Sequence, residues 1–424
     1  MPENLTLHTT WGRDPLPAAG DGQVAYLLLD VGVGGTPDAT PAQLPLNLTL
    51  VLDHSGSMSG PKLTHLKEAV TRIIDELTPQ DTLAIIVFDE HAKVIVPAGP
   101  VDDPTAMQAA VAAIREAGGT QMSSGLKAGL EQARQTSSGT VSRIILLTDG
   151  QTWGDADECE RLAGEAGQAG IPISAFGVGA DEDWSVSLLD KIAEQSHGQA
   201  DYIAQPADTL ASFRGTVQTM QRTAVKGAVL TLQLAAGVNV RTIYRINPMI
   251  GRVKLAQTDP LVAEVTLGDL GREGTTAVLA ELLVPPRKPG QYRIVRAAVR
   301  AADSVEVPVT PASSDVLLQF EAGAKTQGNP RVMNLVEKAT AFKLQTRALE
   351  EAEVGNTVAA SRNLRSAATR LLNLGETDLA QAAEQEATQL EQQGKMSAAG
   401  TKKLTFATRK LTLDDSAVVE SEKQ

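Results

Sequence analysis

The sequence predicts three parts: an α/β doubly wound parallel sheet inserted in an antiparallel β-sandwich, followed by a C-terminal helical bundle. Apolar runs alternate with amphipathic helices over residues 46–222, which favours the parallel sheet. Strand patterns separated by Gly and Pro turns replace the helices over residues 223–320, which favours the sandwich. The stretch 328–412 is rich in Ala, Leu, Glu and Gln and breaks at glycines, as helix ends prefer.

The α/β domain opens with an expected strand at 46–53, an apolar run that ends in an acid. A helix should follow, because apolar residues recur on one helical face at Leu63, Leu66, Val70, Ile73, Ile74 and Leu77. Later strands are predicted at 83–88, 143–148, 171–178 and 200–203. Helices are predicted near 104–116, 123–135, 157–169, 184–195 and 208–220. This alternation predicts a sheet with helices on both faces.

Residues 1–45 hold two strand patterns, at 5–11 and 23–31, which are too few for a sheet of their own. We expect them to join the sandwich, so that the α/β domain is an insertion in it. The other sandwich strands are predicted at 228–234, 262–267, 276–284, 292–299 and 304–309. The C-terminal helices are predicted at 335–353, 357–374, 377–393 and 397–410, and the polar tail 413–424 is expected to be flexible.

Composition and charge narrow the function classes. The formal net charge of −13 and the aromatic content of 3% disfavour a nucleic-acid surface, which needs positive charge and exposed rings. No run reaches the roughly 18 apolar residues of a membrane span, and the N-terminus lacks a signal-peptide pattern. The single cysteine, Cys159, leaves no internal disulfide. We therefore expect a cytoplasmic protein without membrane contact, and the sequence leaves its oligomeric state open.

Three short segments carry oxygen donors at predicted strand ends or loops. Asp53, Ser55 and Ser57 form an Asp-x-Ser-x-Ser pattern after the first strand. Thr120 follows two glycines ahead of a helix, and Asp149 closes a later strand. Because the carboxyl ends of parallel strands meet at one edge, these side chains should converge. Two carboxylates and three hydroxyls are hard ligands, which suit Mg²⁺, with Ca²⁺ or Mn²⁺ as alternatives, better than zinc or copper.

The same five residues resemble the metal-ion-dependent adhesion site of the von Willebrand factor A-type (VWA) family, and the resemblance covers about residues 46–222. It implies that Ser55 and Ser57 bind the ion directly and that Thr120 does so in the form that grips a ligand. It implies that the two aspartates bind directly or through water. The wider layout resembles bacterial intracellular VWA proteins and the heavy chains of inter-alpha-trypsin inhibitors.

Each of these residues also has a plain structural interpretation, such as a strand-end cap for Asp53 or turn formation for the serines. Their occurrence together favours the metal site. His54 occupies the variable slot of the motif, and its side chain should point away from the ion. Asp89 and Glu90 end the second strand and are expected to border the site, whereas the acidic residues 181–183 are expected in a solvated loop.

The predicted function is a divalent-cation-dependent protein-binding module in which an acidic residue of a partner protein completes the shell of the metal. Two alternatives stay open: a scaffold in which the metal only staples loops, and an adaptor for a separate ATPase of the chelatase or chaperone class. The sequence holds no phosphate loop, no nucleophile elbow and no cluster of its five histidines. We therefore expect that the protein is not an enzyme.

Overall fold

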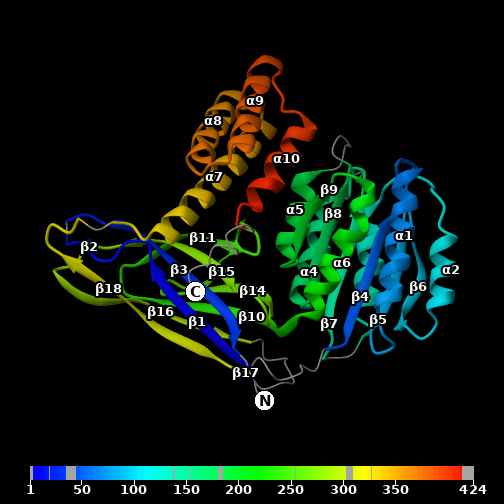
Figure 1. Ribbon diagram of the computed structural model, residues 1–424, viewed down its shortest axis with the longest axis horizontal. Helices are drawn as coiled ribbons and strands as arrows, with labels where there is room; N and C mark the ends of the chain where they lie inside the picture. Colours follow the sequence, from blue (N-terminus) through cyan, green and yellow to red (C-terminus); the bar gives the residue numbers. More distant parts are fainter. Residues whose placement is uncertain are drawn as a thin grey trace. The chain divides into compact units, whose positions relative to one another are not determined.

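The computed structural model describes residues 3–18, 20–34, 44–136, 139–152, 154–179, 185–253, 255–301, 309–325 and 327–412 (Figure 1). The chain divides into two compact units. One holds residues 38–226 with 304–306, and the other holds residues 1–37, 227–303 and 307–424. Among the described residues, no helix combines the length and apolar character that a membrane crossing requires. The predicted strand at 304–309 lies outside these residues except for Val309, and the tail 413–424 lies wholly outside them.

The α/β unit is built on a six-stranded sheet of order β6-β5-β4-β7-β8-β9. Its strands are β4 (Leu46–Asp53), β5 (Thr82–Phe88), β6 (Ala92–Pro100), β7 (Val141–Thr148), β8 (Ile173–Val178) and β9 (Gln199–Ile203). All neighbours pair in parallel except β5 and β6, which are antiparallel. The edge strand β6 was not predicted, because it contains Pro97 and Gly99 and is mostly solvent-accessible, features that an edge strand tolerates.

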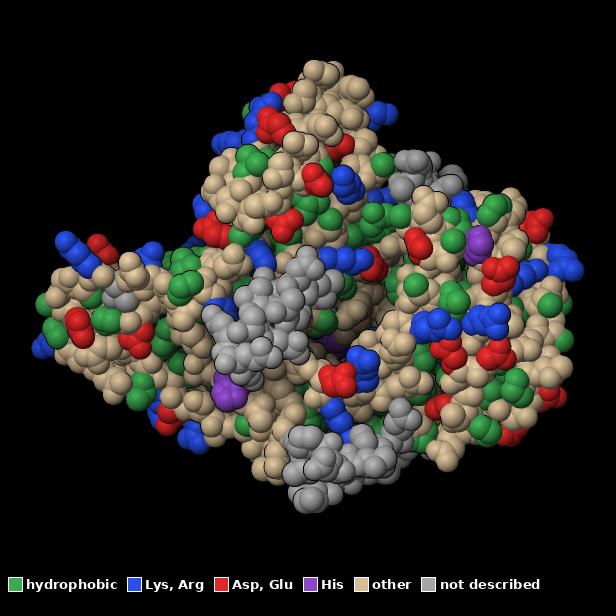
Figure 2. Space-filling model, viewed as in Figure 1, with side chains coloured by type: hydrophobic (Ala, Val, Ile, Leu, Met, Phe, Trp, Pro, Cys, Tyr) green, Lys and Arg blue, Asp and Glu red, His purple; other side chains and the backbone are tan. Residues whose placement is uncertain are grey.

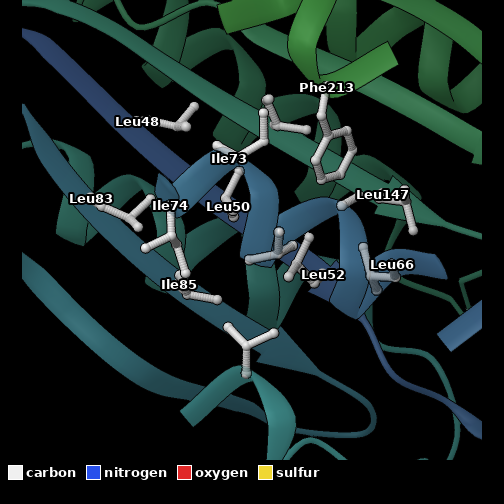
Figure 3. Close-up of a cluster of buried hydrophobic side chains, with 14 of the residues drawn as sticks. Leu48, Leu50, Leu52, Leu66, Ile73, Ile74, Leu83, Ile85, Leu147 and Phe213 are labelled. Atoms are coloured by element: carbon white, nitrogen blue, oxygen red, sulfur yellow. The ribbon is translucent and has the colours of Figure 1, made fainter. Parts of the chain in front are cut away.

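Helices cover both faces of this sheet. They are α1 (Pro61–Glu76), α2 (Pro104–Ala112), α3 (Met122–Ala133), α4 (Ala156–Gln168), α5 (Val186–Gln195) and α6 (Thr209–Gln221), with short 3-10 turns η1 (Gly56–Met58) and η2 (Pro206–Asp208). Helices α1, α2 and α6 form one layer, and α3, α4 and α5 form the other. Leu48, Leu50 and Leu52 of β4 point to the first layer, where they meet Ile73 and Phe213 (Figure 3).

The opposite face of β4 receives α3 at very short range. A β-carbon added to Gly129 would lie 2.4 Å from Val51 Cγ2, and one added to Gly125 would lie 2.6 Å from Phe88 Cδ1. Only glycine permits this approach. Since α3 begins directly after the loop that carries Thr120, these glycines also fix the position of that loop over the end of β4.

The second unit contains a β-sandwich of two six-stranded sheets, of order β12-β11-β15-β3-β1-β17 and β13-β14-β10-β16-β18-β2. The N-terminal strands β1 (Glu3–Trp11) and β3 (Gln23–Gly34) belong to the first sheet, where β3 pairs with β15 (Thr276–Val284) over nine residue pairs. The chain leaves the sandwich after β3, forms the α/β domain, and returns to the sandwich at β10 (Thr223–Leu234). The α/β domain is therefore an insertion in the sandwich, and the predicted fold class is confirmed.

The remaining sandwich strands are mostly antiparallel. They are β2 (Leu16–Pro17), β11 (Asn239–Asn247), β12 (Gly251–Arg252), β13 (Ala256–Asp259), β14 (Val262–Gly271), β16 (Gly290–Arg300), β17 (Val309–Thr310) and β18 (Ala312–Glu321). Two short parallel pairings, β1 with β17 and β18 with β2, join the edges of the sheets. The strands β11 and β18 were not predicted, although both are long members of the sandwich.

The C-terminal helices α7 (Pro330–Glu353), α8 (Thr357–Asn373), α9 (Thr377–Gln393) and α10 (Ala398–Arg409) pack side by side and share one apolar core with the sandwich. At the start of α7, Nη1 and Nη2 of Arg331 donate to the buried carboxylate of Asp30 in β3, at 2.9 and 2.8 Å. At the other end, Thr412 Oγ1 donates to the Ile246 carbonyl at 2.7 Å. The helical domain is thus anchored to the sandwich at both of its termini.

The close packing of α3 on the sheet gives a first test. Gly129→Ala should destabilise the protein by about 1–3 kcal/mol, because overpacking against Val51 outweighs the gain of about 1 kcal/mol in helix propensity. Gly164→Ala is the matched control, since a β-carbon at this glycine of α4 meets nothing within 4 Å. That variant should be neutral or stabilised. Urea unfolding followed by circular dichroism measures both, and equal effects of the two substitutions would contradict the packing argument.

The Asp30–Arg331 pair gives a second test. Arg331→Gln should lower the stability of the sandwich unit by about 1–3 kcal/mol, because it leaves a buried carboxylate without its cation, while the half-exposed arginine loses less. The double variant Asp30→Asn/Arg331→Gln should recover part of the loss. The control is Arg72→Gln, whose partner Asp75 is exposed at 4.0 Å and whose removal should cost under about 0.5 kcal/mol. Thermal unfolding of the wild type, Asp30→Asn, Arg331→Gln and the double variant measures the coupling, and strict additivity of the two single substitutions would count against it.

Candidate metal centre

The parallel pairing of β4 with β7 builds one edge of the candidate site. Leu52 of β4 pairs with Leu147 of β7, so that Asp53 and Thr148 end the two strands side by side. Asp149 follows Thr148 directly. Ligands of open α/β sheets bind outside the carboxyl ends of the strands, and the two aspartates lie at that edge.

The loop after β4 folds around the Asp53 carboxylate. Asp53 Oδ1 accepts a hydrogen bond from the Ser55 amide at 2.8 Å, and Oδ2 accepts one from Thr148 Oγ1 at 2.6 Å. The loop then forms the turn η1, and Gly60 adopts a positive φ of 74° just before α1 begins. A backbone with positive φ favours glycine, so this position allows the sharp entry into the helix.

Four of the five predicted ligands lie in two linked groups of hydrogen bonds. The hydroxyls of Ser55 and Ser57 are 3.0 Å apart, and Ser57 Oγ donates to Asp149 Oδ1 at 2.7 Å. The Ser55 backbone connects this chain to Asp53. Asp53 has no exposed surface and Asp149 is 1% exposed. The structure therefore gathers two buried carboxylates and two hydroxyls in one place.

Thr120 reaches the same place from the loop before α3. That loop is bound to the β4 loop through the Gly56 amide and the Gly118 carbonyl, 3.3 Å apart, and through the Ala117 amide and the His54 carbonyl, 2.9 Å apart. A β-carbon placed on Gly150 would lie 3.5 Å from Thr120 Oγ1 and 3.8 Å from Ser57 Oγ. Both hydroxyls thus border the small space beside Gly150, which any larger side chain would fill.

The electrostatics of the site favour a cation. Burial raises the pKa of the Asp53 carboxyl, and the nearby Asp149 charge adds to the rise, while hydrogen bonds from Thr148 and Ser55 oppose it. A carboxylate that burial and a second acid destabilise is stabilised most by a positive charge close by. The donors at hand are two carboxylates and three hydroxyls, and all five suit a hard divalent cation. No group of three or more His, Cys, Asp or Glu that could hold a metal occurs in the described part of the chain, so hydroxyls are essential to this set.

Three supporting residues were missed from the sequence. Thr148 donates to Asp53, and the Lys62 ammonium lies 2.6 Å from Asp149 Oδ2. Thr152 Oγ1 accepts from the Met122 amide at 3.1 Å and hydrogen-bonds to Asp155, which ties the loop after β7 to the start of α3. Thr148 could have been found, because it ends the strand predicted to lie beside the one that ends in Asp53. Thr152 and Lys62 carry no such local signal.

The neighbours of the motif lie around its loops. His54 turns away from the cluster, with Nδ1 2.7 Å from the Arg115 carbonyl and Nε2 4.0 Å from Asp89 Oδ2. A β-carbon on Gly118 would lie 3.1 Å from Asp89 Oδ2, and one on Gly119 would lie 3.4 Å from Glu90 Cγ, so both acids border the Thr120 loop. Residues 181–183 lie outside the described residues.

Comparison with known proteins places the chain in a family. Residues 47–218 match the family described as von Willebrand factor type A domain, and residues 330–414 match the one described as Sll0103-like, C-terminal alpha-helical domain. The protein sll0103 of Synechocystis sp. is 31% identical over 319 residues, which cover 73% of this chain and 75% of that protein. Human inter-alpha-trypsin inhibitor heavy chain H4 is 27% identical over 240 residues, but these cover only 26% of its length.

Two solved structures share the fold over nearly the whole chain. A von Willebrand factor type A protein from Catenulispora acidiphila has a TM-score of 0.76 at 20% identity, covering 95% of this chain and 96% of that one. The ArnB paralog VWA2 from Sulfolobus acidocaldarius has a TM-score of 0.58 at 15% identity, covering 96% and 99%. At these identities the likeness establishes the fold alone. Together with the identity to sll0103, it confirms that this chain belongs to the VWA family and carries an Sll0103-like helical domain.

Proposed function

We propose that this protein is a divalent-cation-dependent protein-binding module, in which an acidic residue of a protein partner completes the shell of a magnesium ion. VWA domains commonly mediate metal-dependent protein interactions. The observation that carries the proposal is the hydrogen-bonded cluster of Asp53, Ser55, Ser57 and Asp149 beside the Thr120 hydroxyl. All five side chains offer oxygen donors.

Magnesium fits this donor set better than calcium. Mg²⁺ takes six oxygen ligands and retains water, and it is usually held by one or two carboxylates. Ca²⁺ takes six to eight ligands, often with bidentate carboxylates, and this site has only Asp53 and Asp149 to supply them. Manganese shares the preference for oxygen and stays an alternative. With five candidate donors for six positions, at least one position is left for water or for a partner carboxylate.

The partner is proposed to be a protein and the role to be binding, not catalysis. Positive and negative side chains lie interspersed on the face shown in Figure 2, and the whole chain carries a formal net charge of −13. The described residues of this face form no continuous basic patch, and the net negative charge disfavours the phosphate backbone of nucleic acids. Catalysis is not proposed, because the cluster of hydroxyls and acids holds no histidine or activated nucleophile. Cys159 is buried, and burial raises the pKa of its thiol, so it stays in its unreactive form. A cytoplasmic location remains a prediction of the sequence.

The loops of the site are joined by direct protein contacts, which supports a binding role over that of a metal staple. The loops after β4 and before α3 share two backbone hydrogen bonds, between Gly56 and Gly118 and between Ala117 and His54. The loop after β7 holds the start of α3 through Thr152. These contacts support the proposal that the metal serves the partner and is not required to hold the three loops together.

The proposal predicts that the protein binds magnesium. Isothermal titration of Mg²⁺ into chelator-treated protein should show one saturable site. Asp53→Ala should weaken this binding at least about 100-fold, because it removes an oxygen donor and the anchor of the Ser55 turn. Asp102→Ala, which removes an exposed acid outside the cluster, is the control and should bind as the wild type does. Unchanged magnesium affinity in Asp53→Ala would sink the proposed site.

Hydrogen exchange distinguishes a metal that serves partner binding from a metal that holds the loops together. Removal of divalent cations should leave the Ala117 and Gln121 amides protected from hydrogen exchange, within about tenfold of their protection with Mg²⁺, because both donate to carbonyls of the neighbouring loops. The amide of Leu50 in the centre of β4 is the internal reference. If protection at Ala117 and Gln121 collapsed in chelator while Leu50 stayed protected, the metal would be a structural staple.

A further inference from the structure

We propose that Lys62 is a positioning residue that shares Asp149 with the bound cation. Its ammonium group lowers the affinity of the site for magnesium alone and gives the loaded site a net positive charge for the partner carboxylate. This inference rests on the proposed function, because it concerns the same cation. It assigns a role to a residue that lies outside the Asp-x-Ser-x-Ser pattern, five positions after Ser57.

The contact between Lys62 and Asp149 is short and largely shielded from solvent. Lys62 Nζ lies 2.6 Å from Asp149 Oδ2 and 3.2 Å from the Ser57 carbonyl. The lysine side chain is 16% exposed and the aspartate side chain is fully covered. The other carboxylate oxygen accepts from Ser57 Oγ. Each oxygen of Asp149 thus has a donor, and the ammonium group lies directly beside one of the proposed ligands.

The position of Lys62 at the start of its helix by itself disfavours a cation. Helix α1 begins at Pro61, so Lys62 lies in the first turn, which contains no acidic residue. The N-terminus of a helix carries a partial positive charge and favours acids over cations. The stability of α1 therefore gives no reason for a lysine at this place. The buried Asp149 carboxylate gives one, since a buried charge needs a partner.

Charge counting shows what the lysine changes. With Asp53 and Asp149 ionised, as metal ligands must be, and Lys62 protonated, these three groups carry a net charge of −1, which a divalent cation turns into +1. Without Lys62, the cation would only neutralise the two acids, and a partner carboxylate would make the site negative. With Lys62, the carboxylate of the partner brings the total to zero. The lysine therefore opposes the binding of magnesium alone and favours magnesium together with an acidic ligand.

The experiment compares four proteins by isothermal titration of Mg²⁺ after treatment with chelator. Lys62→Gln keeps a hydrogen-bond donor but loses the charge, and it should bind Mg²⁺ about tenfold more tightly than the wild type, because a cation at short range no longer repels the ion. Lys62→Arg keeps the charge and should stay within about twofold of the wild type. Lys93→Gln removes an exposed lysine of β6 and should change nothing.

A second arm uses acetate as the probe for a partner carboxylate. Replacing chloride by acetate should strengthen Mg²⁺ binding more in the wild type than in Lys62→Gln, since only the wild-type site stays positive after loading. The two arms together separate this role from that of an ordinary structural ion pair. A structural pair would make Lys62→Gln less stable without tightening its grip on magnesium.

Three results would overturn the inference: equal or weaker magnesium affinity in Lys62→Gln, an equal acetate effect in both proteins, or a Lys62→Gln protein that stays unfolded in excess Mg²⁺. The last result counts because magnesium should replace the lost charge on Asp149. If neither protein binds Mg²⁺, the proposed function falls as well. Binding in Lys62→Gln but not in the wild type would support the inference most strongly, because it would show the ammonium holding the ion out.

Discussion

The site depends on the parallel pairing of β4 with β7 at the centre of the sheet. This pairing carries Asp53 and Asp149 to the same edge and buries both carboxylates against the ends of apolar strands. Parallel strands need helical crossovers, so loops from three crossovers meet at that edge and bring Ser55, Ser57 and Thr120 with them. The glycines of α3 then decide how closely the Thr120 loop approaches, because they let that helix lie directly on β4.

Burying two acids side by side is costly, and the neighbouring residues show how the fold compensates for it. Asp53 receives a hydroxyl and an amide proton, and still has a raised pKa. Asp149 receives a hydroxyl proton and an ammonium group. The two acids are thus treated differently: Asp53 is held by neutral donors, and Asp149 by a charge. The neutral donors leave Asp53 in need of a cation, whereas Lys62 partly satisfies Asp149 and so tunes how strongly the cluster demands one.

The features that could be predicted from the sequence are those that depend on residues close together in the chain. Asp53, Ser55 and Ser57 follow one strand within five residues, and strands with unbroken apolar runs such as β4 are easily recognised. What it missed depends on partners far along the chain. The edge strand β6 has too few buried positions to show a pattern, and in β18 the exposed Leu317 between the buried Val316 and Leu318 hides the alternation. Lys62 looks like any surface lysine of a helix until the fold brings Asp149, which lies 87 positions away, to its side chain.

The same reasoning bears on the second unit, where the helical domain could have been a flexible appendage. Instead, Arg331 is fixed on the buried Asp30 carboxylate, and the chain beyond α10 is fixed on β11 through Thr412. Buried residues of α7, among them Val332, Val336 and Phe342, also share an apolar core with the sheet. Anchoring at both ends removes the freedom that a linker would give. The helices are therefore anchored to the sandwich, the part of the chain from which the VWA domain departs and to which it returns.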